Sequence, residues 1–448
     1  MKKKTFYIKT LGCKVNQVES AFLIEELEKY GFKLTSEQEA QIYILNSCTV
    51  THKAEAETKK IIKRWKNKFS PELIILAGCY SQVYYKEIYE WAKKNNINNL
   101  LILGQEDKFR ITEILNTSFN LKEPVIKVTP IQEFTSCYPI ILKRFYGHAR
   151  AFVKVQDGCD QFCSYCIVPY TRGSPRSLPI SLVLKQIDFY IRQGYKEIVL
   201  TGIHLGKWGK DLKPAQKFSE LLLAIEDYLK TYDETFNLRL SSLEVKEIDE
   251  EFLAYAKESK FLVPHFHIPL QSGSNKILKL MNRHYTQEEY LETLEKLYKL
   301  FPHATFGADI IVGFPEETEE DFLETCKVVK NSPLNWLHIF PFSPRPGTKA
   351  EKMPDKIPAN IIHERINILR KIIEEKRKEF LKSEIGKIRK VILEKYDENK
   401  QAWKGLSENY INVLLKNITS ETKFKGKIVK VKFIKQENSY LIGEVLDN

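Results

Sequence analysis

Three cysteines near the middle of the chain have a spacing that suits an iron–sulfur cluster. Cys159, Cys163 and Cys166 form a C-x3-C-x2-C pattern within the run DGCDQFCSYC. A four-iron cluster needs four ligands, so three thiolates on one loop leave one iron open to a substrate. The alternatives are a structural zinc site, which would want a fourth close Cys or His, and disulfide pairing.

The residues around this triplet predict a sharp turn at the end of a strand. Asp157, Gly158 and Asp160 are typical turn residues. The preceding segment, residues 151–156, alternates apolar and polar side chains, which predicts a strand with one face in solvent. Loops that follow barrel strands are where barrel enzymes carry their chemistry. We therefore expect the triplet at such a position.

A second group of three cysteines is spread over the first eighty residues. Cys13, Cys48 and Cys79 each follow a short apolar run that predicts a buried strand, at residues 6–8, 42–45 and 73–77. Predicted helices over residues 19–30 and 54–68 alternate with these strands, which indicates a doubly wound parallel sheet. The carboxyl ends of its strands meet at one edge, where such sheets bind ligands. Taken singly, each of these cysteines fits a buried core position better than a ligand position, but three at equivalent strand ends favour a shared ligand role.

The rest of the chain predicts two further structural units. Strands alternate with amphipathic helices through the middle of the sequence, at residues 197–201, 237–241, 266–270, 305–312 and 336–341. A long charged helix follows over residues 361–381. Short strands separated by turn residues then predict a small all-β barrel, at residues 389–394, 411–414, 427–433 and 441–446. We place the domains at residues 1–125, 140–375 and 382–448.

Length and composition limit the class of protein. A chain of 448 residues has room for about three domains. The sequence has no apolar run long enough for a membrane span and no signal-peptide pattern, so we expect a cytoplasmic protein with reduced cysteines. A net charge of +12 favours a polyanionic partner, although a lysine-rich solvated surface gives the same sum. Cys137 and Cys326 receive no role, and Cys326 is expected in the core.

The central motif resembles that of the radical S-adenosylmethionine (SAM) superfamily, including the aromatic Tyr165 before the last cysteine. The resemblance implies that Cys159, Cys163 and Cys166 are catalytic and hold a [4Fe-4S] cluster, with SAM on the fourth iron. In such enzymes the reduced cluster cleaves SAM to a 5′-deoxyadenosyl radical. It also implies that the central strands form a partial, TIM-like (β/α)6 barrel with a lateral opening.

The N-terminal phrases TLGCKVNQVES, NSC and AGC resemble the methylthiotransferase family within that superfamily. This implies an auxiliary [4Fe-4S] cluster on Cys13, Cys48 and Cys79, whose open iron carries the inserted sulfur, and two SAM molecules per turnover. GCKVNQ and GLSENYI resemble the branch that acts on N6-threonylcarbamoyladenosine in tRNA. The implied reaction is methylthiolation of carbon 2 of that base at position 37.

The same resemblance implies the partners. They are the tRNA anticodon stem-loop, an electron donor such as flavodoxin or ferredoxin, and a sulfur donor, with the enzyme a monomer and no membrane involved. The C-terminal unit resembles a TRAM RNA-binding barrel. Within it we expect Trp403, on a loop beside Lys404, to stack on RNA bases, and Phe433 to fill the core.

The resemblance also implies a set of SAM contacts at the strand ends. Within TGIHLGKWG the backbone receives the SAM amino group, and SSLE offers hydrogen bonds to the ribose or the methionine part. PLQSGS lies at another strand end, and ADIIVGFP lies near the adenine. An arginine pairs with the SAM carboxylate. The contacts are Thr201, Gly202, Ser242, Glu244, Gln271, Ser272, Arg283, Ile311 and Gly313. The chain departs from the family's usual GFPGET at Glu316, where a positive φ would strain a side chain.

Other functions remain compatible with the sequence. Methylthiolation of a ribosomal protein side chain, or of isopentenyladenosine in tRNA, uses the same chemistry. A different class is a non-catalytic iron–sulfur protein that binds RNA or senses redox state. Cleavage of SAM by the reduced protein separates the radical enzyme from this last class.

Overall fold

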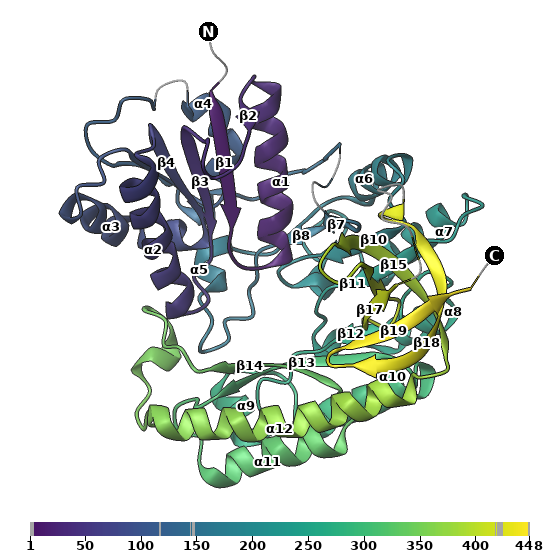
Figure 1. The fold of residues 1–448 in the computed structure, drawn as a ribbon. Helices are drawn as coiled ribbons and strands as arrows, with labels where there is room; N and C mark the ends of the chain where they lie inside the picture. The colour runs from purple at the N-terminus through teal and green to yellow at the C-terminus, as the bar shows by residue number, and fades with distance from the viewer. Residues whose placement is uncertain are drawn as a thin grey trace.

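The computed structural model describes residues 4–115, 118–143, 145, 148–416, 418 and 424–446. Figure 1 shows an N-terminal α/β unit, a central unit of parallel strands and helices, and a C-terminal β-barrel. This is the predicted fold class. The ends of the outer predicted domains, residues 1–3 and 447–448, lie outside the described residues.

The N-terminal unit contains a six-stranded parallel sheet with the strand order β2-β1-β3-β4-β5-β6. The strands are β1 (Thr5–Thr10), β2 (Lys33–Leu34), β3 (Ile42–Ser47), β4 (Leu73–Gly78), β5 (Leu100–Leu103) and β6 (Val125–Lys127). The helices are α1 (Lys14–Lys29), α2 (His52–Phe69), α3 (Cys79–Lys94) and α4 (Ile111–Leu115). Helix α1 begins directly after Cys13, five residues before the predicted start.

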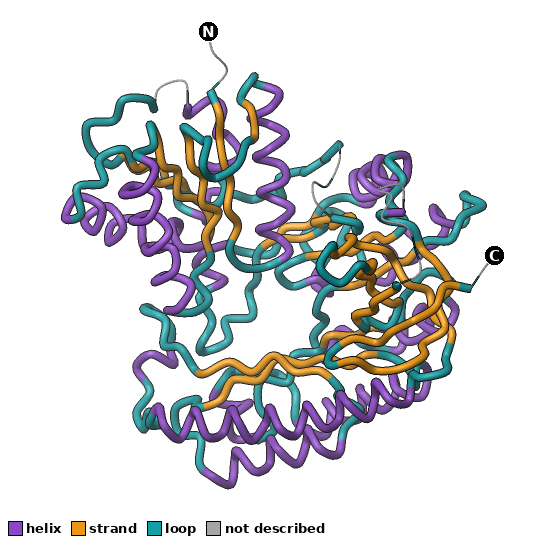
Figure 2. The backbone as a smooth tube through the Cα atoms, in the orientation of Figure 1, coloured by secondary structure: helices purple, strands orange, loops and turns teal. Residues whose placement is uncertain are grey.

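The sheet is covered on both faces, as a doubly wound fold requires. Alternate residues of β3 and β4 join two separate apolar clusters: Ile44 and Ile75 pack with α1, and Tyr43 and Ile74 pack with α2 and α3. Side chains of a strand alternate between faces, so burial of both sets explains why these strands read as continuous apolar runs. The two helix layers flank the sheet in Figure 2.

The central unit is a partial barrel of six parallel strands. They form two three-stranded sheets, β7-β10-β11 and β12-β13-β14, which backbone hydrogen bonds join near Leu238. The strands are β7 (Ala151–Lys154), β10 (Glu197–Thr201), β11 (Asn237–Leu240), β12 (His265–His267), β13 (Thr305–Val312) and β14 (Trp336–Pro341). The main helices around them are α6 (Ile180–Arg192), α7 (Phe218–Leu229), α8 (Glu250–Glu258), α10 (Gln287–Leu300), α11 (Glu319–Asn331) and α12 (Ala359–Ser383). Cys326 is buried in α11, as expected.

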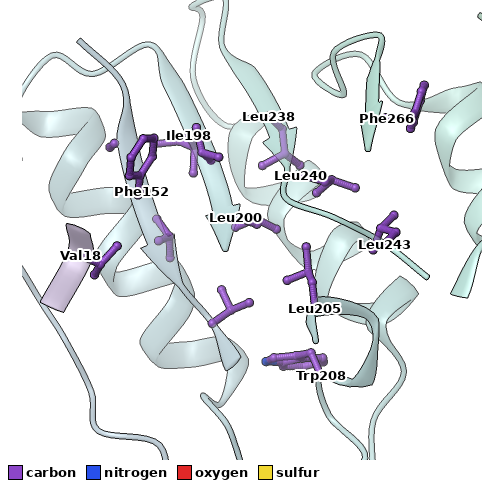
Figure 3. Close-up of a cluster of buried hydrophobic side chains, with 14 of the residues drawn as sticks. Val18, Phe152, Ile198, Leu200, Leu205, Trp208, Leu238, Leu240, Leu243 and Phe266 are labelled. Carbon is purple, nitrogen blue, oxygen red and sulfur yellow. The ribbon is translucent and has the colours of Figure 1, made fainter. Parts of the chain in front are cut away.

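One apolar cluster runs from the N-terminal sheet into the barrel. Val18 of α1 lies beside Phe152 of β7 in Figure 3, and both belong to the same buried cluster. Helix α1 therefore packs against the sheet on one side and the barrel on the other. Since apolar burial contributes about 25 cal/mol per Å², this shared core fixes the two units against each other.

The prediction that residues 151–156 have one face in solvent is wrong. Lys154 and Gln156 are fully buried. The Lys154 ammonium lies 3.1 Å from the Glu19 carboxylate of α1 and 2.6 Å from Asp157. Lys154 faces helix α1 of the N-terminal unit, whose Glu19 is far away in sequence, and Gln156 bonds to Asp157, Gly158 and His204 within the barrel.

A buried network of charged side chains crosses the boundary between α1 and the barrel. Glu19 accepts hydrogen bonds from Lys108 (2.6 Å) and Arg172 (3.0 Å). Arg172 also pairs with Asp157 at 2.9 Å and donates to Asn16 at 2.6 Å. Burial alone would raise the pKa of Glu19, but Arg172, Lys108 and Lys154 hold that pKa far below its ordinary value. Glu19 is therefore ionised in a site without solvent.

The C-terminal unit is a closed five-stranded barrel in the order β15-β16-β17-β19-β18. Its strands are β15 (Ile388–Asp397), β16 (Ala402–Ser407), β17 (Asn412–Leu415), β18 (Ile428–Glu437) and β19 (Tyr440–Val445). The expectation that Trp403 lies on an exposed loop is wrong: it is on β16, 2% exposed, in the barrel core with Phe433. Phe433 fills the core as predicted.

The GLSENYI phrase forms the turn that holds this barrel against the central unit. The Tyr410 ring stacks on His265 of β12 with centroids 4.0 Å apart. Arg239 of β11 donates to the carbonyls of Ser407 and Glu408. The phrase therefore has a structural role at the amino ends of the barrel strands. Within the described part of the chain, no helix is long and apolar enough to cross a membrane.

The strain expected at Glu316 is present, because its φ is 66°. A left-handed conformation costs a residue with a Cβ about 1 kcal/mol or more, and glycine avoids this cost. We expect Glu316→Gly to raise the free energy of unfolding by about 0.5–1 kcal/mol in urea unfolding. The matched change Glu292→Gly, inside α10, should lower it by about 1 kcal/mol. Loss of stability in Glu316→Gly would show that the side chain makes a compensating contact.

The ionised Glu19 makes stability depend on pH. Glu19→Gln leaves the buried cations short of one negative charge, so we expect a loss of about 3–5 kcal/mol at pH 7. The unfolded carboxyl takes up a proton near pH 4 while the native one stays ionised. The advantage of the wild type over the variant should therefore be full above about pH 4 and shrink as pH falls further.

Urea unfolding of both proteins between pH 7 and pH 3 measures this difference. Glu26→Gln on the same helix, whose partner is the exposed Lys29, is the control and should change stability by less than about 1 kcal/mol. A difference for Glu19→Gln that stays constant over the pH range would contradict the assignment.

Candidate active site

The loop with Cys159, Cys163 and Cys166 is held by backbone contacts that leave little freedom. Gly158 has a φ of 77°, and a Cβ there would lie 2.0 Å from the Ser174 carbonyl oxygen, so only glycine fits. The Cys159 amide donates to the Gly173 carbonyl at 2.9 Å. The loop follows β8 (Gln156–Asp157) and is continued by α5 (Val168–Arg172). The triplet thus lies just beyond the carboxyl end of β7, as predicted.

Two side chains, His204 and Arg283, contact sulfur atoms of this triplet, and each is paired with a glutamate. His204 Nδ1 lies 3.3 Å from Cys159 Sγ, and its Nε2 lies 2.6 Å from a Glu247 carboxylate oxygen. Burial lowers the pKa of His204, but its bonds to Cys159 and Glu247 outweigh burial and raise that pKa to about 10. Arg283 Nη1 donates to Cys163 Sγ at 3.4 Å. Sequence reasoning missed His204 and Glu247, although His204 stands within the TGIHLGKWG phrase.

The N-terminal triplet lies at the carboxyl edge of the parallel sheet, as predicted. Cys13 follows β1 and Cys48 follows β3, and these neighbouring strands are where the chain changes direction across the sheet. Such a switch point is where open α/β sheets bind ligands. Gly12 brings the loops together: its φ is 96°, and a Cβ there would lie 2.8 Å from Cys48 Cβ. Cys79 begins α3 after the adjacent β4, and its charge acts on Cys13 and Cys48.

The environment of the N-terminal triplet suits an anionic cluster. Arg172 is fully buried and lies within electrostatic reach of Cys13 and Cys79. The buried network beside it holds four cationic side chains, Lys108, Lys154, Arg172 and Arg176, against three acids, Glu19, Glu106 and Asp157. Burial raises the pKa of Glu106 and lowers the pKa of Lys108, so one acid and one base of the network are both shifted toward their neutral forms. Three thiolates on a four-iron cluster give a net negative charge that this excess balances.

The chemistry of the donor set fits iron–sulfur ligation. All eight cysteines, each within the described part of the chain, are free thiols. Among the described residues, no three Cys, His, Asp or Glu side chains converge closely enough to hold a single metal ion. Each thiolate of a four-iron cluster binds a different iron, so its ligands stand farther apart than those of a single metal ion. Burial raises the pKa of Cys48 and of Cys166 to about 12, so binding iron must displace protons.

A cavity of about 210 Å³ lies between the two triplets. Val50 and Thr51, which follow Cys48, line it from the N-terminal unit. From the barrel it is lined by Cys166, Gln271, Ile311 and Phe340. Residues from both cysteine loops therefore border the same space.

The structure places the predicted SAM contacts in different settings. Gln271 and Ile311 line the cavity, and backbone hydrogen bonds connect them. Arg283 pairs with Glu244 and contacts Cys163, so its guanidinium already has an anionic partner. Ser272 is buried and contacts Thr325 inside the barrel wall.

The remaining four predicted SAM contacts are not among the residues that line this cavity. Gly313 packs on Ile362 of α12, Gly202 packs against Gln156, and Thr201 is buried at the end of β10. Ser242 is exposed on the loop after β11. These positions fit a role in the turns that end each strand.

The inner wall of the barrel carries titratable groups that sequence reasoning did not single out. Asp309 of β13 lines the cavity, and its carboxylate lies 3.2 Å from His267 Nε2. Burial raises the pKa of Asp309 to about 7, with Glu244 adding repulsion and Arg283 opposing it. Burial lowers the pKa of His267 to about 3, so this imidazole is neutral. The only sequence signal for Asp309 and His267 was the alternation of side chains along β12 and β13.

Lys14 extends from the N-terminal triplet toward the same wall. It follows Cys13 at the start of α1. Burial lowers the pKa of Lys14 to about 8, and Arg150 and Arg239 add repulsion. The side chain therefore stays largely cationic at neutral pH. Sequence reasoning had used it only as part of the GCKVNQ phrase.

Comparison with known proteins matches two family models to these two parts of the chain. The radical SAM superfamily matches residues 153–329, and the uncharacterized protein family UPF0004 matches residues 5–99. The first range contains the C-x3-C-x2-C loop, and the second contains Cys13, Cys48 and Cys79.

Full-length relatives show the same combination. The threonylcarbamoyladenosine tRNA methylthiotransferase MtaB of Aquifex aeolicus is 35% identical, covering 94% of this chain and 98% of the relative. The tRNA-2-methylthio-N(6)-dimethylallyladenosine synthase of Clostridium botulinum (strain Okra / Type B1) is also 35% identical, covering 98% and 96%. Because both relatives are 35% identical to this chain, these comparisons do not decide between the threonylcarbamoyladenosine and the dimethylallyladenosine branch.

A solved structure supports the fold. The radical SAM methyltransferase TsrM from Kitasatospora setae superimposes with a TM-score of 0.54 at 12% identity, over 76% of this chain and 75% of that one. The chain therefore belongs to the radical SAM methylthiotransferases, a family that uses a [4Fe-4S] cluster with SAM and carries an auxiliary cluster.

Proposed function

We propose that this enzyme methylthiolates carbon 2 of N6-threonylcarbamoyladenosine beside the anticodon of tRNA. Cys159, Cys163 and Cys166 would hold the SAM-binding [4Fe-4S] cluster. Cys13, Cys48 and Cys79 would hold the auxiliary cluster that delivers sulfur. When bound, the first cluster and SAM supply a radical able to remove a hydrogen that no ordinary base can take.

The observation that carries this proposal is the single cavity between the two cysteine loops. Val50 and Thr51 on one side and Cys166 on the other leave space in which a target carbon can face both loops. An enzyme that used SAM alone would need only the barrel half of this arrangement. The shared cavity supports a reaction in which radical formation and sulfur delivery act on one atom.

The chain's own residues have defined tasks in this reaction. Arg172 and its network stabilise negative charge on the N-terminal triplet. Glu247 orients His204 against Cys159, which fixes that sulfur. Ile311 and Phe340 make the cavity wall apolar, which excludes water from a reactive radical.

An RNA substrate is supported by the free edge of the barrel. Trp336, His338 and Phe340 lie along one face of β14, with ring centroids 5.9 Å and 6.3 Å apart. Trp336 is 37% exposed and Phe340 is 40% exposed. Arg377 lies 5.3 Å from the Trp336 ring. Exposed rings beside a guanidinium suit unpaired bases, so this strand replaces the buried Trp403 as our proposed RNA contact.

The remaining alternatives are chemically close. A ribosomal protein side chain would need no base-stacking surface, and isopentenyladenosine would suit an apolar cavity. A non-catalytic iron–sulfur protein would need neither a SAM site nor a shared cavity. Anaerobic assays with dithionite, SAM and anticodon stem-loop RNA separate these functions. Formation of 2-methylthio-N6-threonylcarbamoyladenosine, detected by mass spectrometry, is the result we expect.

Removing each cysteine triplet tests the two cluster assignments. Changing Cys159, Cys163 and Cys166 together to Ala should lower iron from about eight to about four per chain and abolish 5′-deoxyadenosine formation. Changing Cys13, Cys48 and Cys79 together to Ala should lower iron by the same amount, leave 5′-deoxyadenosine formation, and abolish the methylthio product.

Changing Cys137 and Cys326 together to Ala is the control, because the proposal gives these two buried cysteines no ligand role. Iron should stay near eight in that variant. Full iron content in either triplet variant, or a wild-type protein that never cleaves SAM, would reject the proposed function.

A further inference from the structure

The loop that follows β14, at residues 343–350 and here called the bridging turn, reverses the chain sharply. The Thr348 amide and hydroxyl both donate to the Arg345 carbonyl, at 3.0 Å and 2.7 Å. Pro346 and Gly347 occupy the two central positions, and Gly347 has a φ of 86°, as a type II turn requires. Local bonds therefore fix the backbone from which the Arg345 side chain extends.

Arg345 binds the loop that follows Cys48. Its side chain is 2% exposed, and its Nη1 donates to the Thr49 carbonyl at 3.2 Å. Its Nη2 lies 3.0 Å from a Glu55 carboxylate oxygen and 3.1 Å from His52 Nδ1, both at the start of α2. One buried guanidinium thus joins the barrel to the N-terminal unit beside a proposed cluster ligand.

The bridging turn also binds the central cysteine loop. The Ala350 amide donates at 2.8 Å to the carbonyl of Ser164, which stands between Cys163 and Cys166. Ala350 is buried in an apolar cluster against which Tyr165 packs. The same short turn therefore contacts both cysteine loops, and it fixes the spacing between them.

One wall of the cavity depends on this connection. Ser343 of the bridging turn lines the cavity from the barrel, and Val50 and Thr51 line it from the loop after Cys48. The His52 amide donates to Ser343 Oγ at 3.2 Å, next to the ion pair of Arg345. Because a buried ion pair admits few geometries, these contacts hold the two sides of the wall in one arrangement.

We propose that Arg345 is a positioning residue for sulfur transfer, which holds the Cys48 loop where the delivered sulfur reaches the target carbon. The inference rests on the proposed function, in which the N-terminal triplet delivers sulfur. A carbon radical is short-lived, so product forms only when the sulfur already lies beside it. Loss of Arg345 should therefore leave SAM cleavage in place and lower the share of cleavage events that give product.

The ratio of 5′-deoxyadenosine to methylthio product, measured anaerobically with anticodon stem-loop RNA, tests this role. Arg345→Met should raise the ratio about 10- to 100-fold, the size expected from loss of a charge-assisted hydrogen bond, while 5′-deoxyadenosine formation stays near the wild-type rate. Glu55→Gln removes the same ion pair from the other side and should also raise the ratio. The double variant should be no worse than the more affected single variant, because both changes break one contact.

Amide hydrogen exchange of the cluster-free protein measures the position of the loop without any activity. Arg345→Met should speed exchange in residues 48–52 and leave exchange in α1 unchanged. Ser343→Ala removes only the hydrogen bond to His52, so it should raise both the ratio and the exchange by less. This smaller change still tests the contact if Arg345→Met does not fold.

The control is Arg389→Met, in the C-terminal barrel, where two hydrogen bonds of 2.7 Å and 2.9 Å join Arg389 to Glu384. This variant should keep the wild-type ratio and the wild-type exchange in residues 48–52. Iron is counted in every variant and should stay near about eight per chain.

Three outcomes for Arg345→Met would overturn the inference while the wild type makes product. They are an unchanged ratio, an equal fall in 5′-deoxyadenosine and product, and a fall to about four irons, which would make Arg345 necessary for holding the cluster. Each of them rejects only the role of Arg345. A wild type that cleaves SAM and never forms a methylthio product would instead reject the proposed function.

Discussion

The buried ion network around Glu19 and Arg172 is the interaction on which the arrangement of the site depends. Arg172 ends the short helix that follows Cys166, and its guanidinium binds both Glu19 of α1 and Asp157 before Cys159. The same side chain lies within electrostatic reach of Cys13 and Cys79. One residue thus connects the loop of Cys159, Cys163 and Cys166, helix α1 and the N-terminal cysteine triplet. Buried ion pairs demand good geometry, so the network admits few relative placements of the two units.

The relative placement of the two units also determines which charges surround the two cysteine triplets. The two proposed clusters with thiolate ligands would bring negative charge into a largely buried region. The excess of buried cations near Cys13 offsets that charge, and His204 and Arg283 do the same at Cys159 and Cys163. Buried cationic side chains therefore lie beside both cysteine triplets, in addition to the charges on the surface.

The sequence predicted what depends on local pattern and spacing. The positions of the six cysteines after parallel strands, the partial barrel and the strained Glu316 could be predicted, because motif, apolar periodicity and φ preference are local properties. The sequence did not predict the surroundings of side chains whose contacts come from residues far away in the chain. Lys154 reads as an exposed residue of an alternating strand, but its partner Glu19 lies 135 positions away. Trp403 lies in β16, a strand that the sequence analysis did not predict, and the five-stranded barrel closes around it. His204 gains its role only from its tertiary neighbours Cys159 and Glu247.

The central claim is that two iron–sulfur clusters face each other across one cavity. Anomalous diffraction at the iron edge, from crystals of the anaerobically reconstituted protein, measures this directly. We predict two iron peaks, one beside Cys13, Cys48 and Cys79 and one beside Cys159, Cys163 and Cys166, with Val50 and Ile311 lining the space between them. A single iron peak, or two peaks separated by the protein core, would contradict the account.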